Sequence, residues 1–340
     1  FSQTKIVPAI QNNPNIVRSF MNRLYSRNLD FIPEFELVNP DMQDKHTARN
    51  AIDNQIRHTI LNLLISNVDA PENSLTHYLC GLTSTSASKL VPSMNEEKQQ
   101  VNDDANCLNI IIESWISNPA MQKSHPMLLS QCYSLIYKLC CDRTVARQVM
   151  HYLEVKDFFG VSHLQNLNKP LPRNETMNYQ LESRANILKI IALRVYVDNT
   201  NKDVQSSVLK KLLDHLFKLE QVVYEENHDF KQNIDPNLVE QHRALMIDLL
   251  DQLDVVARAQ PVVQFSNLQR SQVESATYKN EFNMTLYNID ALSELTKNDT
   301  QALDMAIRWN AYQTRYAALC KVFQGWKQLV EITLSKCFDL

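Results

Sequence analysis

Glycine is almost missing from this chain. It occurs three times in 340 residues, as Gly81, Gly160 and Gly325, where an average usage of about 7% would give roughly two dozen. Hairpins, phosphate-binding loops and strand edges draw on glycine because it reaches positive φ at no steric cost. Helices and the short turns between them can instead use Asn, Asp and Pro. The shortage predicts an all-α fold and excludes glycine-rich nucleotide-binding loops.

Metal-binding spacings and long apolar runs are missing as well. The chain contains no Cys-x-x-Cys pair and no His-Glu-x-x-His sequence, which argues against a zinc site. Its longest apolar stretch, 187–197, includes Lys189 and Arg194 and is shorter than the roughly 20 residues that a helix needs to cross a bilayer. We therefore expect no metal, no cofactor and no membrane span.

An excess of charge of either sign is absent too. With 34 Lys and Arg against 38 Asp and Glu, the net charge is −4, so the chain has no broad electrostatic footprint for nucleic acid. The apolar content of 44% is ample for a continuous core. An odd number of cysteines in apolar stretches indicates buried free thiols in a reducing compartment. The seven are Cys80, Cys107, Cys132, Cys140, Cys141, Cys320 and Cys337.

What the chain does contain is a series of apolar segments at helical spacing, separated by Pro, Asn and Asp. Polar stretches at about 82–104 and 224–235 indicate surface loops. Up-and-down helices with short connections are typical of α-solenoids, so we predict an irregular superhelix of HEAT/ARM type, one continuous block over 1–340. The ends look like cuts through a longer chain. The expected helices lie at about 14–25, 46–68, 74–79, 105–117, 127–141, 145–153, 177–197, 204–224 and 237–259.

The last segment, about 300–338, predicts one long helix with a heptad seam, because apolar residues alternate there in steps of four and three. At 1.5 Å per residue it would be roughly 55 Å long. Its expected partner is the preceding helix, around 284–295, packed antiparallel. Gly325 would permit the close approach of a neighbour beside Trp326. The seam consists of Met305, Trp309, Tyr312, Tyr316, Leu319, Phe323, Trp326, Val330, Thr333 and Cys337.

Few side chains could carry catalysis. The candidate nucleophiles are Cys132, Cys140 and Cys141, with His125 or His151 as a base. A helical cysteine without an activating charge is usually a small buried apolar residue, and we interpret these three in that way. The acidic groups Glu225-Glu226 and Asp248, Asp251 and Asp254 are explained by solvated helix faces. We therefore expect no catalytic, cofactor-binding or metal-binding residue, no small-molecule substrate and no enzymatic activity.

The aromatic residues of the last helix could form a stacking platform for single-stranded nucleic acid, but such platforms come with a positive groove. At heptad spacing the aromatic residues are more typical of a core. We assign the basic residues of that helix to its solvent-exposed side. They are Arg308, Arg315, Lys321 and Lys327.

Several short strings occur together in this chain: 77–81 (HYLCG), 132–140 (CYSLIYKLC), 150–153 (MHYL) with 157–158 (DF), 264–274, and 326–332 (WKQLVEI). In this order and spacing, the chain resembles the large inner-ring nucleoporins of the nucleoporin 205 and nucleoporin 192 class. The strings extend over nearly the whole chain and correspond to an internal portion in the later half of a much larger protein. No partner-binding residue of that family maps onto a motif here.

The resemblance implies a question-mark-shaped α-solenoid in the inner ring of the nuclear pore complex, at the nuclear envelope. Such a scaffold binds linker nucleoporins and neighbouring inner-ring scaffold proteins, supports protein and mRNA transport, and has no enzymatic activity. The family also carries one unusually long helix, called a tower, for which the segment at 300–338 is a candidate. The alternative is a HEAT-type transport receptor or adaptor that binds Ran or cargo.

Overall fold

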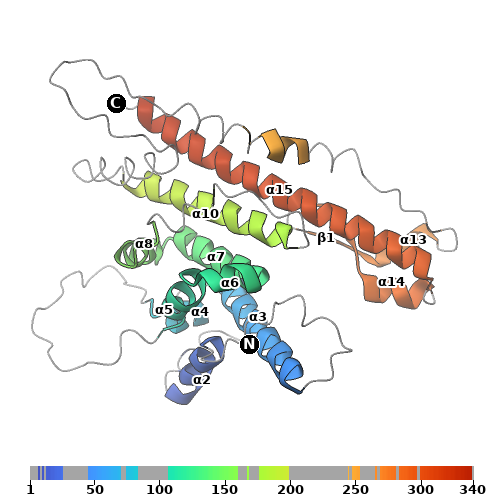
Figure 1. Cartoon of the computed structure of the whole chain (residues 1–340), viewed down its shortest axis with the longest axis horizontal. Helices are drawn as coiled ribbons and strands as arrows, with labels where there is room; N and C mark the ends of the chain where they lie inside the picture. The colour runs from blue at the N-terminus through green and yellow to red at the C-terminus, as the bar shows by residue number, and fades with distance from the viewer. Residues whose placement is uncertain are drawn as a thin grey trace, which may run out of the picture. The chain divides into compact units, whose positions relative to one another are not determined.

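The computed structural model describes residues 7, 10, 13–25, 45–69, 74–82, 106–159, 167, 176–198, 244, 247–252, 265, 269–280, 283–296 and 299–338. These residues are mostly helical (Figure 1). The loops expected at 82–104 and 224–235 and the helix at 204–224 lie outside them, apart from Leu82. The elements are α2 (Pro14–Leu24), α3 (Lys45–Ser66), α4 (Leu75–Leu79), α5 (Cys107–Ile110), the π-helix η2 (Ile111–Ile116), α6 (Pro119–Ser124), α7 (Pro126–Cys141), α8 (Ala146–Val155), α10 (Met177–Asp198), α13 (Arg270–Ser275), β1 (Thr277–Lys279), β2 (Thr285–Tyr287), α14 (Ile289–Thr296) and α15 (Thr300–Phe338).

The chain divides into two compact units. Unit 1 comprises Phe1–Lys169, Ser183–Leu212 and Gly325–Leu340, and unit 2 comprises Pro170–Glu182 and Leu213–Gln324. Helices α10 and α15 contribute residues to both. The prediction of one continuous block over 1–340 concerns how these parts are joined, and it stays a prediction.

Several helices of unit 1 begin where the sequence supplies a cap or a proline. The Asn118 side chain accepts a hydrogen bond from the Ala120 backbone N–H (3.1 Å), and Pro119 opens α6. Asn106 caps α5 in the same way (2.8 Å), and Ser74 caps α4 (3.1 Å). Such caps satisfy backbone donors that have no partner within the helix. For this reason the predicted starts of most helices agree with the structure to within about two residues.

The segment expected as one α-helix at 105–117 is in fact two elements. It begins as α5 and continues as η2, in which the Ser117 N–H bonds to the Ile112 carbonyl five residues earlier (2.9 Å). The wider helical turn places four large side chains of η2 in the core. These are Ile111, Ile112, Trp115 and Ile116.

Helix α7 is the centre of unit 1, packed between α3, α8, α6 and η2. Its buried Tyr133 meets Phe158 edge-on with ring centroids 6.2 Å apart. Polar contacts join it to α3 and to the turn that follows: Gln131 donates to Asn62 (2.9 Å), and Lys138 donates to the Ile65 carbonyl (3.4 Å) and pairs with Asp69 just beyond α3 (3.2 Å). Residues later in α3 lie opposite residues later in α7, so the two helices run parallel.

Unit 2 contains a short antiparallel hairpin, which the all-α prediction did not include, although the described residues are mostly helical as predicted. Strands β1 and β2 pair Thr277 with Tyr287 and Lys279 with Thr285. Asn283, at φ 59°, supplies the positive φ that the glycine argument assumed to be out of reach. The Asn310 side chain of α15 accepts from the Tyr287 N–H (2.8 Å) and donates to its carbonyl (2.7 Å), so the outer edge of β2 is satisfied.

The helix expected around 284–295 is therefore only α14, preceded by β2. It packs on the first turns of α15 around buried Ala276, Leu292 and Ala306. Trp309 donates from its indole nitrogen to the Thr285 carbonyl (2.8 Å), which ties α15 to the hairpin.

Helix α15 has the predicted length but buries a different face from the predicted seam. Of the seam residues described, Leu319 is fully buried, whereas Val330 is 48% exposed and the others are partly buried. The residues that are buried include many small ones, which let neighbouring elements approach: α14 and the hairpin near the start of α15, and another helix near Gly325. They are Ala302, Ala306, Gln313, Ala317, Ala318, Leu319, Val322, Gly325 and Leu329.

The neighbour is α10, which runs beside α15 (Figure 1). In unit 2, Arg315 contacts the Met177 sulfur (3.3 Å) and Lys321 pairs with Glu182 (2.6 Å), so the two helices are parallel. In unit 1, a Cβ added at Gly325 would lie 3.0 Å from the Ala185 carbonyl oxygen and 3.1 Å from the Leu188 Cβ. This confirms the predicted close approach at Gly325.

We predict that Gly325→Ala lowers stability. In a helix interior alanine is normally better than glycine by about 1 kcal/mol, but here the added methyl group meets backbone, and overpacking costs about 1 to 3 kcal/mol. Urea titration followed by circular dichroism measures the difference. The exposed neighbour Gln324→Ala, which should be nearly neutral, is the control. A stabilised Gly325→Ala protein would contradict the close contact.

Candidate interaction surfaces

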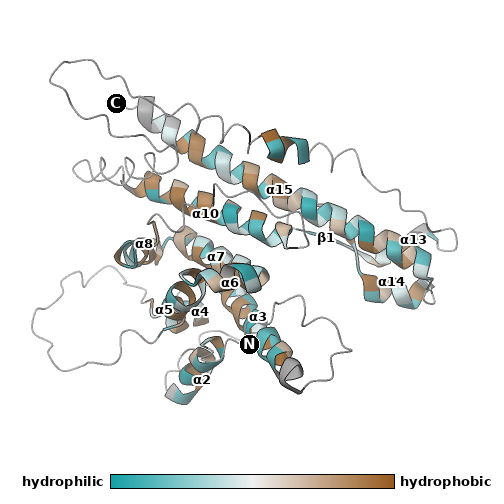
Figure 2. Cartoon of the chain, in the orientation of Figure 1, coloured by the Kyte–Doolittle hydropathy of each residue, from teal (hydrophilic) through white to brown (hydrophobic). Residues whose placement is uncertain are grey.

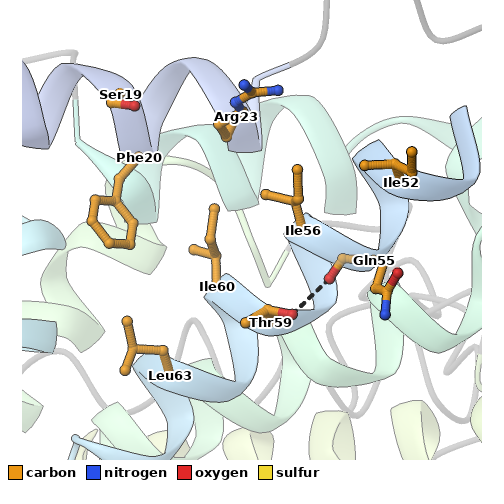
Figure 3. Close-up of a pocket in the computed structure, with 9 residues that line it drawn as sticks. All are labelled: Ser19, Phe20, Arg23, Ile52, Gln55, Ile56, Thr59, Ile60 and Leu63. Carbon is orange, nitrogen blue, oxygen red and sulfur yellow. Dashed lines mark hydrogen bonds between the residues drawn. The ribbon is translucent and has the colours of Figure 1, made fainter. Parts of the chain in front are cut away.

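A groove lies between α2 and α3 and has a volume of about 470 Å³ (Figure 3). Phe20 comes from α2, and three isoleucines and Leu63 come from one stripe of α3. Figure 3 shows Phe20, Ile60 and Leu63 around the same space. Ile60 is buried, whereas Ile52 at the open end is 58% exposed. The full lining is Ser19, Phe20, Arg23, Ile52, Gln55, Ile56, Thr59, Ile60 and Leu63.

The groove carries one cationic group at its edge. Arg23 donates from one guanidinium nitrogen to Asp53 Oδ1 at 3.3 Å, and its side chain is 58% exposed. The hydroxyl of Thr59 is already bonded to the Gln55 carbonyl of its own helix (2.8 Å). The remaining surface is chiefly hydrocarbon.

A row of aromatic rings begins at the hairpin of unit 2 and follows α15. Phe265 meets Tyr287, Tyr287 meets Trp309, and Trp309 meets Tyr312, at centroid separations of 5.5, 6.4 and 6.2 Å. Tyr312 and Tyr316 then lie nearly parallel at 6.5 Å. The rings are only partly buried, so this row is a surface of the helix and not the core that its spacing predicted.

The sequence analysis expected the basic residues of α15 to share one solvent-exposed side, but the structure places them on different sides. Arg308 and Lys327 are exposed and pair with Asp304 (2.9 Å) and Glu331 (3.7 Å) one turn away. Arg315 and Lys321 instead turn toward α10. These two basic side chains meet the first part of α10, at Met177 and Glu182. The apolar residues of α10 gather instead in the half that follows Ala185 (Figure 2).

The three candidate nucleophiles all lie on α7 and differ in their exposure. Cys132 and Cys140 are buried, as the sequence analysis expected, whereas Cys141 is exposed, so the adjacent Cys140 and Cys141 point to different faces of α7. Burial raises the pKa of Cys107 to about 12 and holds the pKa of the Cys140 thiol well above its usual value. A thiol with a raised pKa is a poor nucleophile at neutral pH.

The two histidines considered as bases lie in different environments. His125 is buried, its Nδ1 bonded to Ser124 (2.8 Å) and its ring edge-on to Trp115, while His151 is exposed. Of the candidate acids, Asp248 accepts from Gln252 (2.7 Å). Glu225, Glu226 and Asp254 lie outside the described residues. Within the described ranges, no three potential metal ligands come together, and no helix is long and apolar enough to traverse a bilayer.

These observations define a class: a mostly helical protein whose notable surface features are an open groove and a partly exposed aromatic row. The model of a family described as nuclear pore complex scaffold, nucleoporins 186/192/205, matches residues 11–340, and the chain therefore belongs to this family. The family is one of scaffold proteins and not of enzymes, as the sequence resemblance predicted.

A curated relative agrees with this assignment. The chain is 24% identical over 325 residues to the human nuclear pore complex protein Nup205. The match covers 84% of this chain and 16% of the relative, so the chain spans about one sixth of that protein.

We predict that Cys141 reacts before the buried cysteines with a thiol alkylating reagent. It is exposed, whereas Cys80, Cys107, Cys132 and Cys140 are buried in the folded chain. Mass spectrometry of the folded protein after short labelling gives the order, and the same labelling in urea controls for intrinsic reactivity. Labelling of Cys107 or Cys140 as early as Cys141 would contradict the packing of α5 and α7.

We predict that Trp326→Ala costs less than Leu329→Ala, although tryptophan is the larger residue. Leu329 is 6% exposed, and its truncation should cost about 2 to 5 kcal/mol. Trp326 is only partly buried, so we expect about half of the 3 to 5 kcal/mol of a fully buried aromatic residue. Urea titrations of both variants test this. The reverse order would restore the aromatic seam as the core face.

Proposed function

We propose that this chain is part of a structural scaffold of the nuclear pore inner ring, which binds other nucleoporins and supports pore assembly and nucleocytoplasmic transport. The observation that carries the proposal is the match to the scaffold family over residues 11–340. The described surfaces are consistent with it, because they offer helix faces for partners and no enclosed site for a small substrate.

We further propose that the helices stack as an α-solenoid. The parallel pairing of α3 with α7 supports this, since equivalent helices of successive helix pairs lie parallel in such folds. The chain returns between them through α4, α5, η2 and α6. The parallel pairing of α10 with α15 follows the same rule.

The partners proposed are linker nucleoporins and neighbouring inner-ring scaffold proteins. A long helix is suited to this role because it presents side chains over a length of about 58 Å at 1.5 Å per residue. Helix α15, with 39 residues, is our candidate for the tower of the family. Its partly buried aromatic residues are of the type that dominates protein interfaces.

The proposal predicts where the protein is found. The endogenous protein that contains this segment, tagged and imaged in intact cells, should give a punctate nuclear rim coincident with pore markers. A transport receptor carrying the same tag is the control, since it should shuttle and stain diffusely. Diffuse staining of the tagged protein would overturn the scaffold proposal and favour the HEAT-type receptor.

A further inference from the structure

We propose that the outer edge of strand β1, Thr277–Lys279, pairs with an extended segment of a partner polypeptide, which joins the hairpin as a third strand. The partner segment would carry an acidic residue opposite Lys279 and an apolar residue opposite Tyr278. This inference deepens the proposed function and rests on it for the biological context, because it states the chemistry of one partner of the scaffold.

The backbone of β1 directs its hydrogen-bonding groups alternately toward β2 and away from it. In an antiparallel pair, every second residue turns its N–H and C=O groups toward the other strand, and the residues between turn theirs outward. The Ala276 carbonyl (2.8 Å) and the Asn280 N–H (3.0 Å) both bond to the backbone of the returning chain. The N–H and C=O groups of Thr277 and Lys279 therefore point away from β2.

The two outer edges of the hairpin differ in how these outward groups are satisfied. On β2, the outward groups of Tyr287 bond to the Asn310 side chain, and the Thr285 carbonyl accepts from Trp309. On β1, no described residue bonds to the two outward N–H groups or to the two outward C=O groups. Helix α15 thus covers the edge of β2 and leaves that of β1. A row of unpaired backbone groups is a template for a further strand.

The edge of β1 is open to a partner. Tyr278 is 52% exposed, and Lys279 is exposed as well. At about 3.4 Å per residue, the outward groups of Thr277 and Lys279 are about 7 Å apart, which is the repeat of an added strand. Tyr278 lies between them at a position where an antiparallel neighbour comes closest, with a Cα separation of about 4.5 Å. An apolar residue of the partner would pack on the tyrosine ring there.

The charge of the edge selects the partner. The Lys279 ammonium group donates to the uncharged Asn283 carbonyl (3.1 Å) and pairs with no carboxylate of the described residues. It keeps two further N–H donors, so it can bind a carboxylate on the residue opposite. A second copy of β1 fits less well, because antiparallel pairing centred on Tyr278 would place the two Lys279 side chains diagonally on one face. A partner helix could not use the edge, since its own backbone groups are bonded internally.

The test begins with short random peptides, displayed as a library and selected on the folded chain. Peptides are kept when Lys279→Pro weakens their binding at least tenfold more than Lys279→Thr does. Both substitutions remove the ammonium group, but only proline removes the outward N–H, and an edge strand tolerates proline at a position that faces solvent. The retained peptides should alternate apolar and polar residues and carry Asp or Glu.

Hydrogen exchange at single amides reports the pairing on the unsubstituted chain, so the result does not depend on how a variant folds. A bound peptide should slow exchange at the outward amides of Thr277 and Lys279 at least tenfold. The amide of Tyr278 is the matched control, because it already faces β2 and should change much less. Equal protection of all three amides, or none, would contradict the added strand.

The acidic position is tested by a double-mutant cycle with fluorescence anisotropy. Lys279→Gln should weaken an acidic peptide several-fold and leave its Gln-substituted version unchanged, whereas equal weakening would overturn the charge assigned to the partner.

Three results would overturn the docking proposal. The first is that no peptide distinguishes Lys279→Pro from Lys279→Thr, and the second is that the retained peptides bind as helices. The third is self-association of the chain that Lys279→Pro abolishes, because a second copy would then occupy the edge. Since binding is measured in solution, its failure leaves the localisation result untouched, and diffuse cellular staining would leave the result at β1 untouched.

Discussion

The contact between α10 and α15 decides which face of the longest helix is buried. At Gly325 the backbone of α15 comes so close to Ala185 and Leu188 that an added methyl group would meet them at 3.0 to 3.1 Å. Close approach of this kind requires small residues, and Gly325 and Ala318 are accordingly buried in this half of α15, while Ala306, nearer its start, packs on Leu292 of α14. The large aromatic side chains are displaced to the flanks, where they remain partly exposed. Small residues inside and large residues outside reverse the usual order of an amphipathic helix.

This reversal explains why the sequence analysis predicted the helix and misplaced its face. A heptad of aromatic residues is a stronger hydrophobic signal than a stripe of alanines, so periodicity alone selects the aromatic stripe. The buried face around Gly325 becomes core because α10 lies against it, whereas Ala306 packs on Leu292 of α14; the partner α10 is remote in sequence, since Met177 is 138 residues from Arg315. Local spacing holds no information on a partner so remote. Gly325 was the one local signal of close packing, since a glycine within a long helix costs about 1 kcal/mol unless a neighbour needs the space.

The starts of the helices between 45 and 198 were predictable for a different reason. Pro119, Pro126 and the side-chain caps Ser74, Asn106 and Asn118 act on backbone groups one to three residues away, so the signal lies within the sequence that it governs. The hairpin at 277–287 was missed because glycine was taken as the requirement for a tight reversal. Asn283 meets that requirement, and Asn310 of α15, which satisfies β2, is remote in sequence.

The α2–α3 groove was missed because both its walls were identified singly and nothing in the sequence placed them side by side. Its orientation follows from the opposite side of α3. His58 and Asn62 bond to Gln131 of α7, Thr76 bonds to the Leu64 carbonyl, and Leu61 and Leu64 are buried, so polar contacts and apolar burial together orient α3 about its axis. At about 100° per residue, the Ile52, Ile56 and Leu63 stripe then lies on another face, away from α7. The contacts on one side of α3 thus determine where the apolar groove on its other side opens.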